Sequence, residues 1–360
     1  MRRLVIFLLF FHTTTISFGQ NQSDSVKTKF KAYPLPVVFF SPETDWGFGA
    51  VSLFSFRFKG EAKESRVSQF QFGAAYTQRN QILFYLPFQL YAKNEKIFSF
   101  GELGYYKYSY RFFGVGSNLQ AANEELYNVT FPRIRLNVMK LAKPKWYVGF
   151  RYWFDEYDIT KTKEGGLLEN NNIVGSNGGT ISSLGLISLI DSRNDYNYPS
   201  SGSYFEFVAL PNLNVFGSDF EFTRFSADYV KYLGKNKNVV AVNLYGVATL
   251  GTVPFNELAL IGGTRRMRGY FEGRFRDRNM LMAQTEFRRE LFWNFGFVAF
   301  AACGVVSKNI ENFEVQNVKP SGGVGLRYRL SQDEKINLRL DYGIGESGSS
   351  GFYLTIGEAF

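Results

Sequence analysis

Few side chains in this 360-residue chain could support acid–base or nucleophilic chemistry. The chain contains one histidine, His12, and one cysteine, Cys303. His12 lies in an N-terminal segment that we expect to be removed, so the mature chain offers no Ser-His-Asp relay, no Cys-His pair and no His-bearing zinc site. Asp155, Glu156 and Asp158 lie close together, but their aromatic neighbours are typical of a strand that runs into a loop. We therefore expect no enzyme activity, no metal site and no cofactor.

Arginine is the residue type with the most informative spacing. Six arginines lie between residues 265 and 278. A solvated charged loop, or a basic patch for nucleic acid or for lipopolysaccharide phosphate, would be the simplest interpretation. Neither explains the glycines of the same segment, Gly262, Gly263 and Gly273. Neither explains why the segment leads into a strand whose alternation places Gln284, Glu286 and Arg288 on one face.

Arg268 and Glu286 are suited to form an ion pair inside the molecule. An arginine in a narrow, partly dry interior needs a partner, because an unpaired buried charge is costly. A carboxylate can accept both ends of a guanidinium group, and glycine lets a loop turn sharply against a wall. We hypothesise that an Arg268–Glu286 pair holds the loop inside, so that Glu286→Ala should release the loop.

The elements that must position these residues are strands. Alternation of apolar and polar residues with period two recurs from end to end, and no segment shows convincing helical periodicity. We predict sixteen strands: 34–41, 46–58, 66–77, 80–92, 96–110, 127–142, 145–158, 179–191, 202–213, 219–233, 237–250, 279–290, 293–306, 319–330, 335–345 and 350–360. One of them, 219–233, has aromatic residues out of phase, which predicts a β-bulge.

The gaps between these strands favour a transmembrane β-barrel. If the connections between these strands are numbered in chain order, the long connections all have odd numbers. This is expected when short periplasmic turns alternate with longer external loops. An even strand number then places both termini in the periplasm. The alternation alone would also fit a soluble barrel, and a secreted β-sandwich or propeller is the alternative. Stripes rich in Phe and Tyr, and the N-terminal segment described next, favour a lipid-facing surface.

The chain ends suggest export and insertion into a membrane. Residues 1–19 have a basic start, an apolar centre and a small-residue exit, as in a secretory signal peptide. Residues 20–33 are then a short periplasmic segment and residues 34–360 the barrel. The final strand ends as many outer-membrane barrels do. Its predicted C-terminal barrel signal consists of Phe352, Leu354, Ile356 and Phe360.

Arg268-Gly269-Tyr270 resembles the R-G-F/Y motif of the sixth external loop in the BamA/TamA surface-antigen superfamily of outer-membrane β-barrels. Glu286 stands where the family has an inward glutamate, and Asp341 closes a segment similar to the family's G-x-G-x-R…D-Y pattern. The resemblance extends from about residue 34 to residue 360. It implies an all-β fold, a sixteen-stranded antiparallel barrel whose sixth external loop folds into the lumen, where its arginine pairs with acids on the wall.

Two departures from the family pattern affect what the resemblance implies. Ala302 stands where the family has an aspartate that pairs with the loop arginine, so the pairing would depend on Glu286 with help from Asp341. The family's periplasmic POTRA domains would have to precede the barrel. Residues 20–33 are too few to form one, so we expect a member without POTRA domains.

The resemblance implies a protein that helps to insert or translocate proteins or lipids at the bacterial outer membrane. Its partners would be outer-membrane lipids and lipopolysaccharide, with a separate periplasmic or POTRA-bearing protein for docking. A passive channel or structural barrel plugged by residues 251–278 is the alternative, and a membrane enzyme that uses only acids, serine or tyrosine is a third. Nucleic acid is not an expected partner, because Arg133, Arg135 and Arg327 alternate with apolar residues and predict a basic interior.

Overall fold

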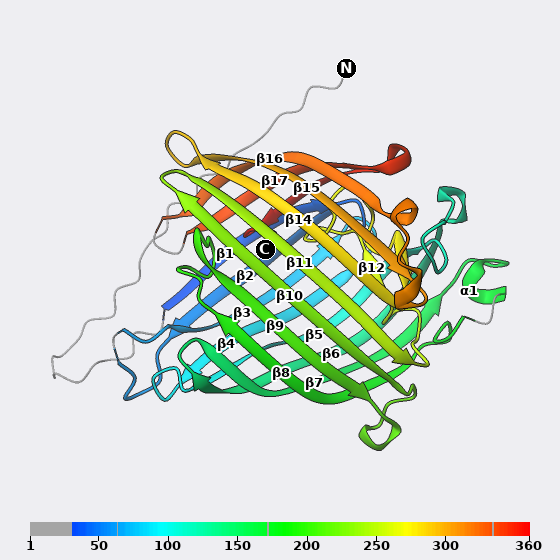
Figure 1. The fold of residues 1–360 in the computed structure, drawn as a ribbon, viewed down its shortest axis with the longest axis horizontal. Helices are drawn as coiled ribbons and strands as arrows, with labels where there is room; N and C mark the ends of the chain where they lie inside the picture. Colours follow the sequence, from blue (N-terminus) through cyan, green and yellow to red (C-terminus); the bar gives the residue numbers. More distant parts are fainter. Residues whose placement is uncertain (1–30, 63, 171–172, 333–334) are drawn as a thin grey trace.

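The computed structural model describes residues 31–360 except 63, 171–172 and 333–334. The expected signal peptide, residues 1–19, lies outside the described residues, as does most of the expected segment 20–33. Sixteen strands run obliquely around one closed antiparallel barrel (Figure 1). Each strand pairs with its neighbours along the chain, and β1 closes the barrel against β18.

The barrel strands alternate in direction around the wall. They are β1 (Lys31–Ser41), β2 (Asp45–Phe56), β3 (Ser68–Thr77), β4 (Ile82–Ala92), β5 (Ile97–Phe112), β6 (Glu125–Lys143), β7 (Trp146–Lys161), β8 (Gly179–Asp191), β9 (Ser201–Asn212), β10 (Phe222–Lys235), β11 (Asn238–Gly251), β14 (Asn279–Glu290), β15 (Phe295–Ser307), β16 (Lys319–Ser331), β17 (Ile336–Gly345) and β18 (Ser350–Ile356).

The remaining elements are short and lie in the connections. Strands β12 (Ala259–Ile261) and β13 (Phe275–Asp277) form a separate two-stranded sheet between β11 and β14. The helical turns are α1 (Leu167–Asn170), η1 (Ala121–Asn123), η2 (Asn214–Phe216), η3 (Ile310–Asn312), η4 (Val315–Asn317) and η5 (Glu346–Gly348). None of the helices in the described part of the chain has the length and apolarity to cross a membrane.

All sixteen predicted strands are present, so the predicted sixteen-stranded antiparallel barrel is confirmed. Strand β1 begins at Lys31, three residues before the predicted start of the barrel. The bulge predicted within 219–233 is wrong, because β10 pairs without interruption with β11 from Phe222 to Lys235 and with β9 from Phe222 to Leu233. Phe220 precedes the strand, and Phe222 is an inward residue in normal phase with the rest of β10.

Alternation gives the wall two different faces. On β14, Leu281 and Phe287 are exposed, whereas Gln284 and Glu286 are buried. In a closed barrel the buried set must point toward the axis, and the exposed apolar set forms the outer surface. The three longest connections are 113–124, 162–178 and 252–278, and they lie with 308–318 at one end of the barrel (Figure 1, right), whereas 57–67, which is as long as 308–318, lies at the other end.

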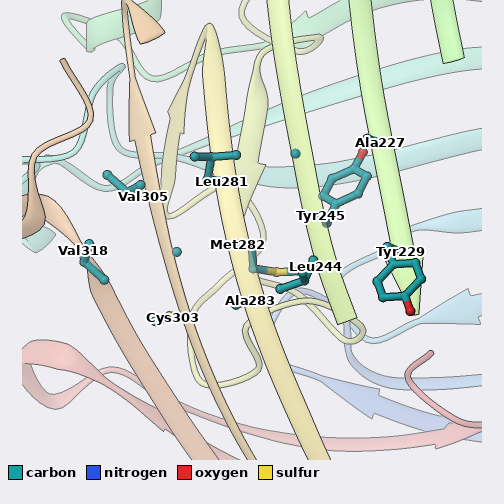
Figure 2. Close-up of a pocket in the computed structure, with 12 residues that line it drawn as sticks. Ala227, Tyr229, Leu244, Tyr245, Leu281, Met282, Ala283, Cys303, Val305 and Val318 are labelled. Atoms are coloured by element: carbon teal, nitrogen blue, oxygen red, sulfur yellow. The ribbon is translucent and has the colours of Figure 1, made fainter. Parts of the chain in front are cut away.

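Small side chains leave an apolar groove on the outer surface of the wall. Its volume is about 480 Å³, and it extends across β10, β11, β14 and β15 (Figure 2). Leu244 and Leu281 border the groove, while Ala283 and the free, exposed Cys303 form part of its floor. The only cysteine of the chain therefore reports on what covers this surface.

We predict that acyl chains cover Cys303. An environment-sensitive fluorophore is attached to Cys303 in the unfolded protein, which is then refolded into liposomes. Because the thiol points away from the barrel axis, lipids brominated on their acyl chains should quench the emission and iodide in the water should not.

A matched control places the label outside the wall. In the Cys303→Ala background, Val315→Cys lies in the connection 308–318 at a position that is 90% exposed. Its emission should be quenched by iodide and not by brominated lipid. Quenching of Cys303 by iodide alone would contradict a lipid-facing outer surface.

Candidate functional site

The connection between β11 and β14, residues 252–278, is a folded element and not a solvated loop. Its two strands pair in antiparallel register, with Leu260 opposite Arg276. Arg276 also forms an isolated bridge with Gly116 in the β5–β6 connection. Within this segment Phe275, Ile261 and Tyr270 are buried in one apolar cluster with Met280 of β14. We refer to residues 252–278 as the arginine loop.

Glycine is required where the arginine loop turns. Gly262, Gly263, Gly269 and Gly273 all have positive φ angles, between 72° and 113°. A Cβ atom on Gly262 would overlap the carbonyl oxygen of Phe271, so a side chain would force the two arms of the turn apart. The three glycines singled out from the sequence, Gly262, Gly263 and Gly273, therefore shape the turns of the loop.

Arg268 lies at the centre of a buried ion-pair cluster. Its Nη2 donates to Glu286 of β14 and its Nη1 donates to Asp341 of β17. Both carboxylates have no exposed surface, and the guanidinium group lies 3.7 Å from the ring centre of Phe300. The structure thus brings together Arg268, Glu286 and Asp341. The Phe300 ring lies against the guanidinium group, and Ala302 occupies the position at which the resemblance predicts a further aspartate.

Three further arginines share the same two carboxylates. Arg288 Nε donates to Glu286 Oε2 at 2.8 Å, and Arg327 Nη1 donates to Asp341 Oδ1 at 2.6 Å. Arg339 Nε lies 3.5 Å from Asp341 Oδ2. The cluster therefore holds four guanidinium groups around two carboxylates, which we call the Arg268 ion-pair cluster. Its members come from the arginine loop and from β14, β16 and β17.

The backbone beside Arg268 packs directly on the wall. A Cβ atom on Gly343 would lie 2.7 Å from the carbonyl carbon of Arg268, and one on Gly325 would overlap Asp341 Oδ1. Gly269 donates from its N–H to Tyr353 Oη at 2.9 Å, and its carbonyl oxygen accepts from Ser349 Oγ at 2.7 Å. Gly343 on β17 is therefore necessary for the close approach of the loop, and Gly325 on β16 leaves room for the Asp341 carboxylate.

Tyr270 bonds to the end of the barrel at which the loop enters. Its hydroxyl donates to the carbonyl oxygen of Pro320 at 2.7 Å and accepts from the N–H of Glu346 at 2.7 Å. A Cβ atom on Gly345 would lie 2.6 Å from the tyrosine ring. The ring therefore lies flat against β17, and its hydroxyl joins β16 to the β17–β18 connection.

The C-terminal residues do not continue the last strand. Phe352, Leu354 and Ile356 lie on β18, but the strand ends at Ile356, and Gly357 has a φ of 85°. Phe360 instead packs against Val230, Tyr232 and Ala241, which are buried residues of β10 and β11. The prediction that the last strand extends to Phe360 is therefore wrong.

This C-terminal tail, residues 357–360, binds the same arginines as the cluster. Glu358 accepts from Arg327 Nε at 2.8 Å and from Asn337 Nδ2 at 2.6 Å. The Phe360 carbonyl oxygen accepts from Arg288 Nη2 at 2.6 Å, and that of Ala359 accepts from Arg265 Nε at 3.1 Å. The buried charge of Glu358 and the positive φ at Gly357 explain why the tail turns away from the outer surface.

A second buried ion-pair group joins the start of the arginine loop to the opposite wall. Asp155 pairs with Arg133 and Arg135 of β6, and it accepts from Tyr157 Oη at 3.0 Å. The same tyrosine hydroxyl lies 3.1 Å from Glu257 of the loop. Asp155 is thus an ion-pair partner within the barrel wall.

Sequence analysis missed several residues of the site. It did not identify Tyr353, Glu358 or the contribution of Arg288 to the cluster. Period-two alternation could have placed Arg288 and Tyr353 inside the barrel, because both occupy inward positions of their strands. In the described part of the chain no group of three or more His, Cys, Asp or Glu side chains is arranged to hold a metal ion.

Glu272 is an acid of the arginine loop with an altered proton affinity. Burial, and then the nearby Glu43 of the β1–β2 turn, raise its pKa, Arg276 and Arg133 lower it, and the net result is a pKa of about 7. The N–H of Glu272 donates to Glu43 Oε1 at 3.0 Å. The negative charges of Glu272 and Glu43 therefore repel each other at this contact.

Comparison with known proteins gives a consistent result. A family model for the Omp85 superfamily domain matches residues 57–360. BamA from Haemophilus ducreyi lacking POTRA domains 1–3 has a similar structure, with a TM-score of 0.59, 15% identity, and coverage of 91% of this chain and 70% of that chain. CdiB from Acinetobacter baumannii has a TM-score of 0.56 and 12% identity, with coverage of 90% of this chain and 59% of that one.

CdiB from Escherichia coli also has a TM-score of 0.56, at 10% identity, with coverage of 92% of this chain and 67% of that chain. At these identities the three structures establish similarity of fold. The chain spans between 59% and 70% of the length of each. No curated protein matches the sequence.

We predict that Glu286→Gln exposes the arginine loop. The substitution keeps the shape of the side chain but leaves Arg268 with Asp341 alone and removes the carboxylate that pairs with Arg288. Breaking a buried pair costs about 3–5 kcal/mol. Trypsin should then cleave the loop of the folded, membrane-inserted protein, and the thermal unfolding midpoint should fall.

The control is Glu290→Gln on the same strand, whose side chain is 48% exposed and pairs with Arg329. An exposed pair contributes about 0–1 kcal/mol, so loop cleavage should stay at the wild-type rate. Equal cleavage in wild type and Glu286→Gln would rule out the cluster as the anchor of the loop.

We further predict that contact of the arginine loop with the β1–β2 turn weakens as the pH rises. The pKa of Glu272 is higher in the folded protein, about 7, than its ordinary value of 4.5. Protonated Glu272 therefore contributes stability that is complete below pH 4.5 and is lost as the pH rises through 7. Hydrogen exchange of residues 270–274, corrected for intrinsic rates, should be faster at pH 8 than at pH 5.5.

Glu272→Gln should remove most of this pH dependence, because the amide mimics the protonated acid. Glu311→Gln, an exposed position in the β15–β16 connection, serves as the control and should leave it intact. A pH dependence that persists in Glu272→Gln would assign the effect to another group.

Proposed function

The chain belongs to the Omp85 superfamily, and from this premise we propose that it inserts or translocates proteins or lipids at the outer membrane through an openable seam between β1 and β18. The protein is a β-barrel of the bacterial outer membrane, and the family resemblance stated from its sequence is confirmed. Barrels of this family act in transport or assembly. The proposal accordingly assigns no catalytic residue.

The observation that supports an openable seam is the pairing of β1 with β18. The two strands share one register pair, Phe40 opposite Leu354. In contrast, β1 pairs with β2 at eleven positions and β17 pairs with β18 at seven. Because each strand hydrogen bond contributes about 0.5–1.5 kcal/mol net, this junction should separate at a lower cost than its neighbours.

The arginine loop supports the same proposal and argues against a passive channel. We infer that the loop occupies the barrel lumen, because Arg268 contacts two inward acids and Met267 packs at Gly304 on the inner face of β15. A passive channel or structural barrel plugged by residues 251–278 is the alternative, and it would conduct ions only when that loop left the lumen.

The proposed partners are outer-membrane lipids, lipopolysaccharide and a separate periplasmic or POTRA-bearing protein. The apolar outer surface meets the lipids, and the end of the barrel that holds the C-terminal tail would meet the periplasmic protein. The residues proposed to control access to the lumen are Arg268, Gly269, Tyr270, Glu286 and Asp341, which join the loop to the wall beside β18.

We predict that a disulfide across the seam abolishes activity. In the Cys303→Ala background, Phe40→Cys and Leu354→Cys occupy opposed positions, where cysteines of antiparallel strands can form a disulfide. Proteoliposomes should accelerate folding of a urea-unfolded outer-membrane barrel when the pair is reduced. On oxidation the rate should fall to that of protein-free liposomes.

The matched control crosslinks the neighbouring junction with Val38→Cys and Phe48→Cys, which are opposed on β1 and β2 and also face outward. Oxidation of this pair should not change the rate. Full activity of the oxidised seam variant would contradict the proposal, and ion conductance without any folding activity would favour the channel. Outer membranes of cells that produce the protein, solubilised in mild detergent, show whether a periplasmic or POTRA-bearing protein copurifies.

A further inference from the structure

We infer that the mouth of the barrel beside the C-terminal tail carries a binding site for a phosphate group. A pocket of about 130 Å³ opens there. Its lining comes from the turns β8–β9, β10–β11, β14–β15 and β16–β17 and from adjoining strand ends. These are the short connections at one end of the barrel, the end that the predicted topology places in the periplasm.

The charge of the pocket is strongly positive. Among the described residues, five cationic side chains line it and Glu290 is the single carboxylate. The five are Lys237, Arg288, Arg289, Arg327 and Arg329. Arg329 pairs with Glu290 at 3.1 Å, and Arg288 and Arg327 pair with acids of the Arg268 ion-pair cluster and the tail, so among the described lining residues Lys237 and Arg289 are the cations in surplus. A multivalent anion is the ligand class that such a surplus attracts.

Two of these arginines have unused donors. Arg288 and Arg327 are at least 96% buried as side chains, and each is held by carboxylates of the Arg268 ion-pair cluster or the tail. Nevertheless Arg288 Nη1 and Arg327 Nη2 have no hydrogen-bond partner. A buried donor without a partner costs about 1–3 kcal/mol. A phosphate group, with several acceptor oxygens and planar guanidinium partners, satisfies this arrangement.

The position of the pocket suggests where the phosphate comes from. The β14–β15 turn that forms its rim exposes Phe292 and Trp293, which are 63% and 88% exposed. Aromatic side chains at the ends of barrel strands lie at the level of the lipid headgroups. Arg289 is exposed on the same strand end and can extend toward that level. A phospholipid headgroup and free phosphate share this chemistry, and the experiment separates them.

The test uses the full barrel in mild detergent and two double variants with the same loss of charge. Lys237→Gln with Arg289→Gln removes two exposed cations of the pocket and leaves the buried cluster intact. Lys93→Gln with Lys145→Gln removes two cations from other turns at the same end of the barrel. Equal unfolding midpoints of the two variants show that both fold.

Two measurements distinguish the sources of phosphate. Native mass spectrometry compares retention of phosphatidylglycerol, phosphatidylethanolamine and diacylglycerol, and a thermal unfolding titration uses inorganic phosphate. We expect wild type to prefer both phospholipids over diacylglycerol. The pocket variant should bind them about tenfold more weakly, equivalent to about 1.4 kcal/mol, and the control variant should bind as wild type does.

Stabilisation by inorganic phosphate as well, lost only in the pocket variant, would identify the site as a general phosphate site. Retention of phospholipid without any effect of inorganic phosphate would identify the headgroup as the ligand. Equal weakening in both variants, equal retention of diacylglycerol, or no binding in either measurement would overturn the proposal.

Discussion

The structure depends on the neutralisation of buried charge by Glu286 and Asp341. These two carboxylates have no exposed surface, and together they pair with four arginines from the arginine loop, β14, β16 and β17. Because a buried charge without a partner is costly, each arginine is stable inside the barrel only while the carboxylates remain in place. The loop and the wall are therefore coupled through shared partners, and a change at one member alters the energy of all the others.

Much of the fold could be predicted from the sequence because a barrel wall has a strict local code. Every strand must alternate between an apolar outer face and an inner face of mixed character, so strands can be recognised one by one. The bulge prediction at 219–233 failed because it assumed that the aromatic residues of the strand share one face, whereas Phe222 is buried inside the barrel and Tyr229 is exposed on the outside. Phe220 precedes the strand and packs beside the apolar cluster around Phe222 and Phe255. An aromatic side chain can therefore occupy either face of a barrel strand.

The site was less predictable because it is formed by contacts between distant segments. Arg268, Glu286 and Asp341 can be named from the sequence since each stands in a recognisable motif, and the structure brings the three together. The C-terminal tail has no such motif. Its residues continue the alternation of β18 through Phe360. The tail nevertheless turns away from the outer surface because of the positive φ angle at Gly357 and the buried ion pair between Glu358 and Arg327. Sequence periodicity contains no information about these long-range partners.

The inner contacts also explain how β18 stays in the wall with one register pair to β1. From inside, Tyr353 Oη accepts from Gly269 of the loop, and Ser349 at the start of the strand donates to the same residue. At its other end the strand continues into a tail that Arg288 and Arg327 bind. The attachment of β18 is thus shared between its ladder with β17 and the ion-pair cluster, and only a small part comes from β1. Separation of β1 from β18 therefore requires little change in the wall itself, whereas inward or outward movement of β18 requires the loop and the tail to release it together.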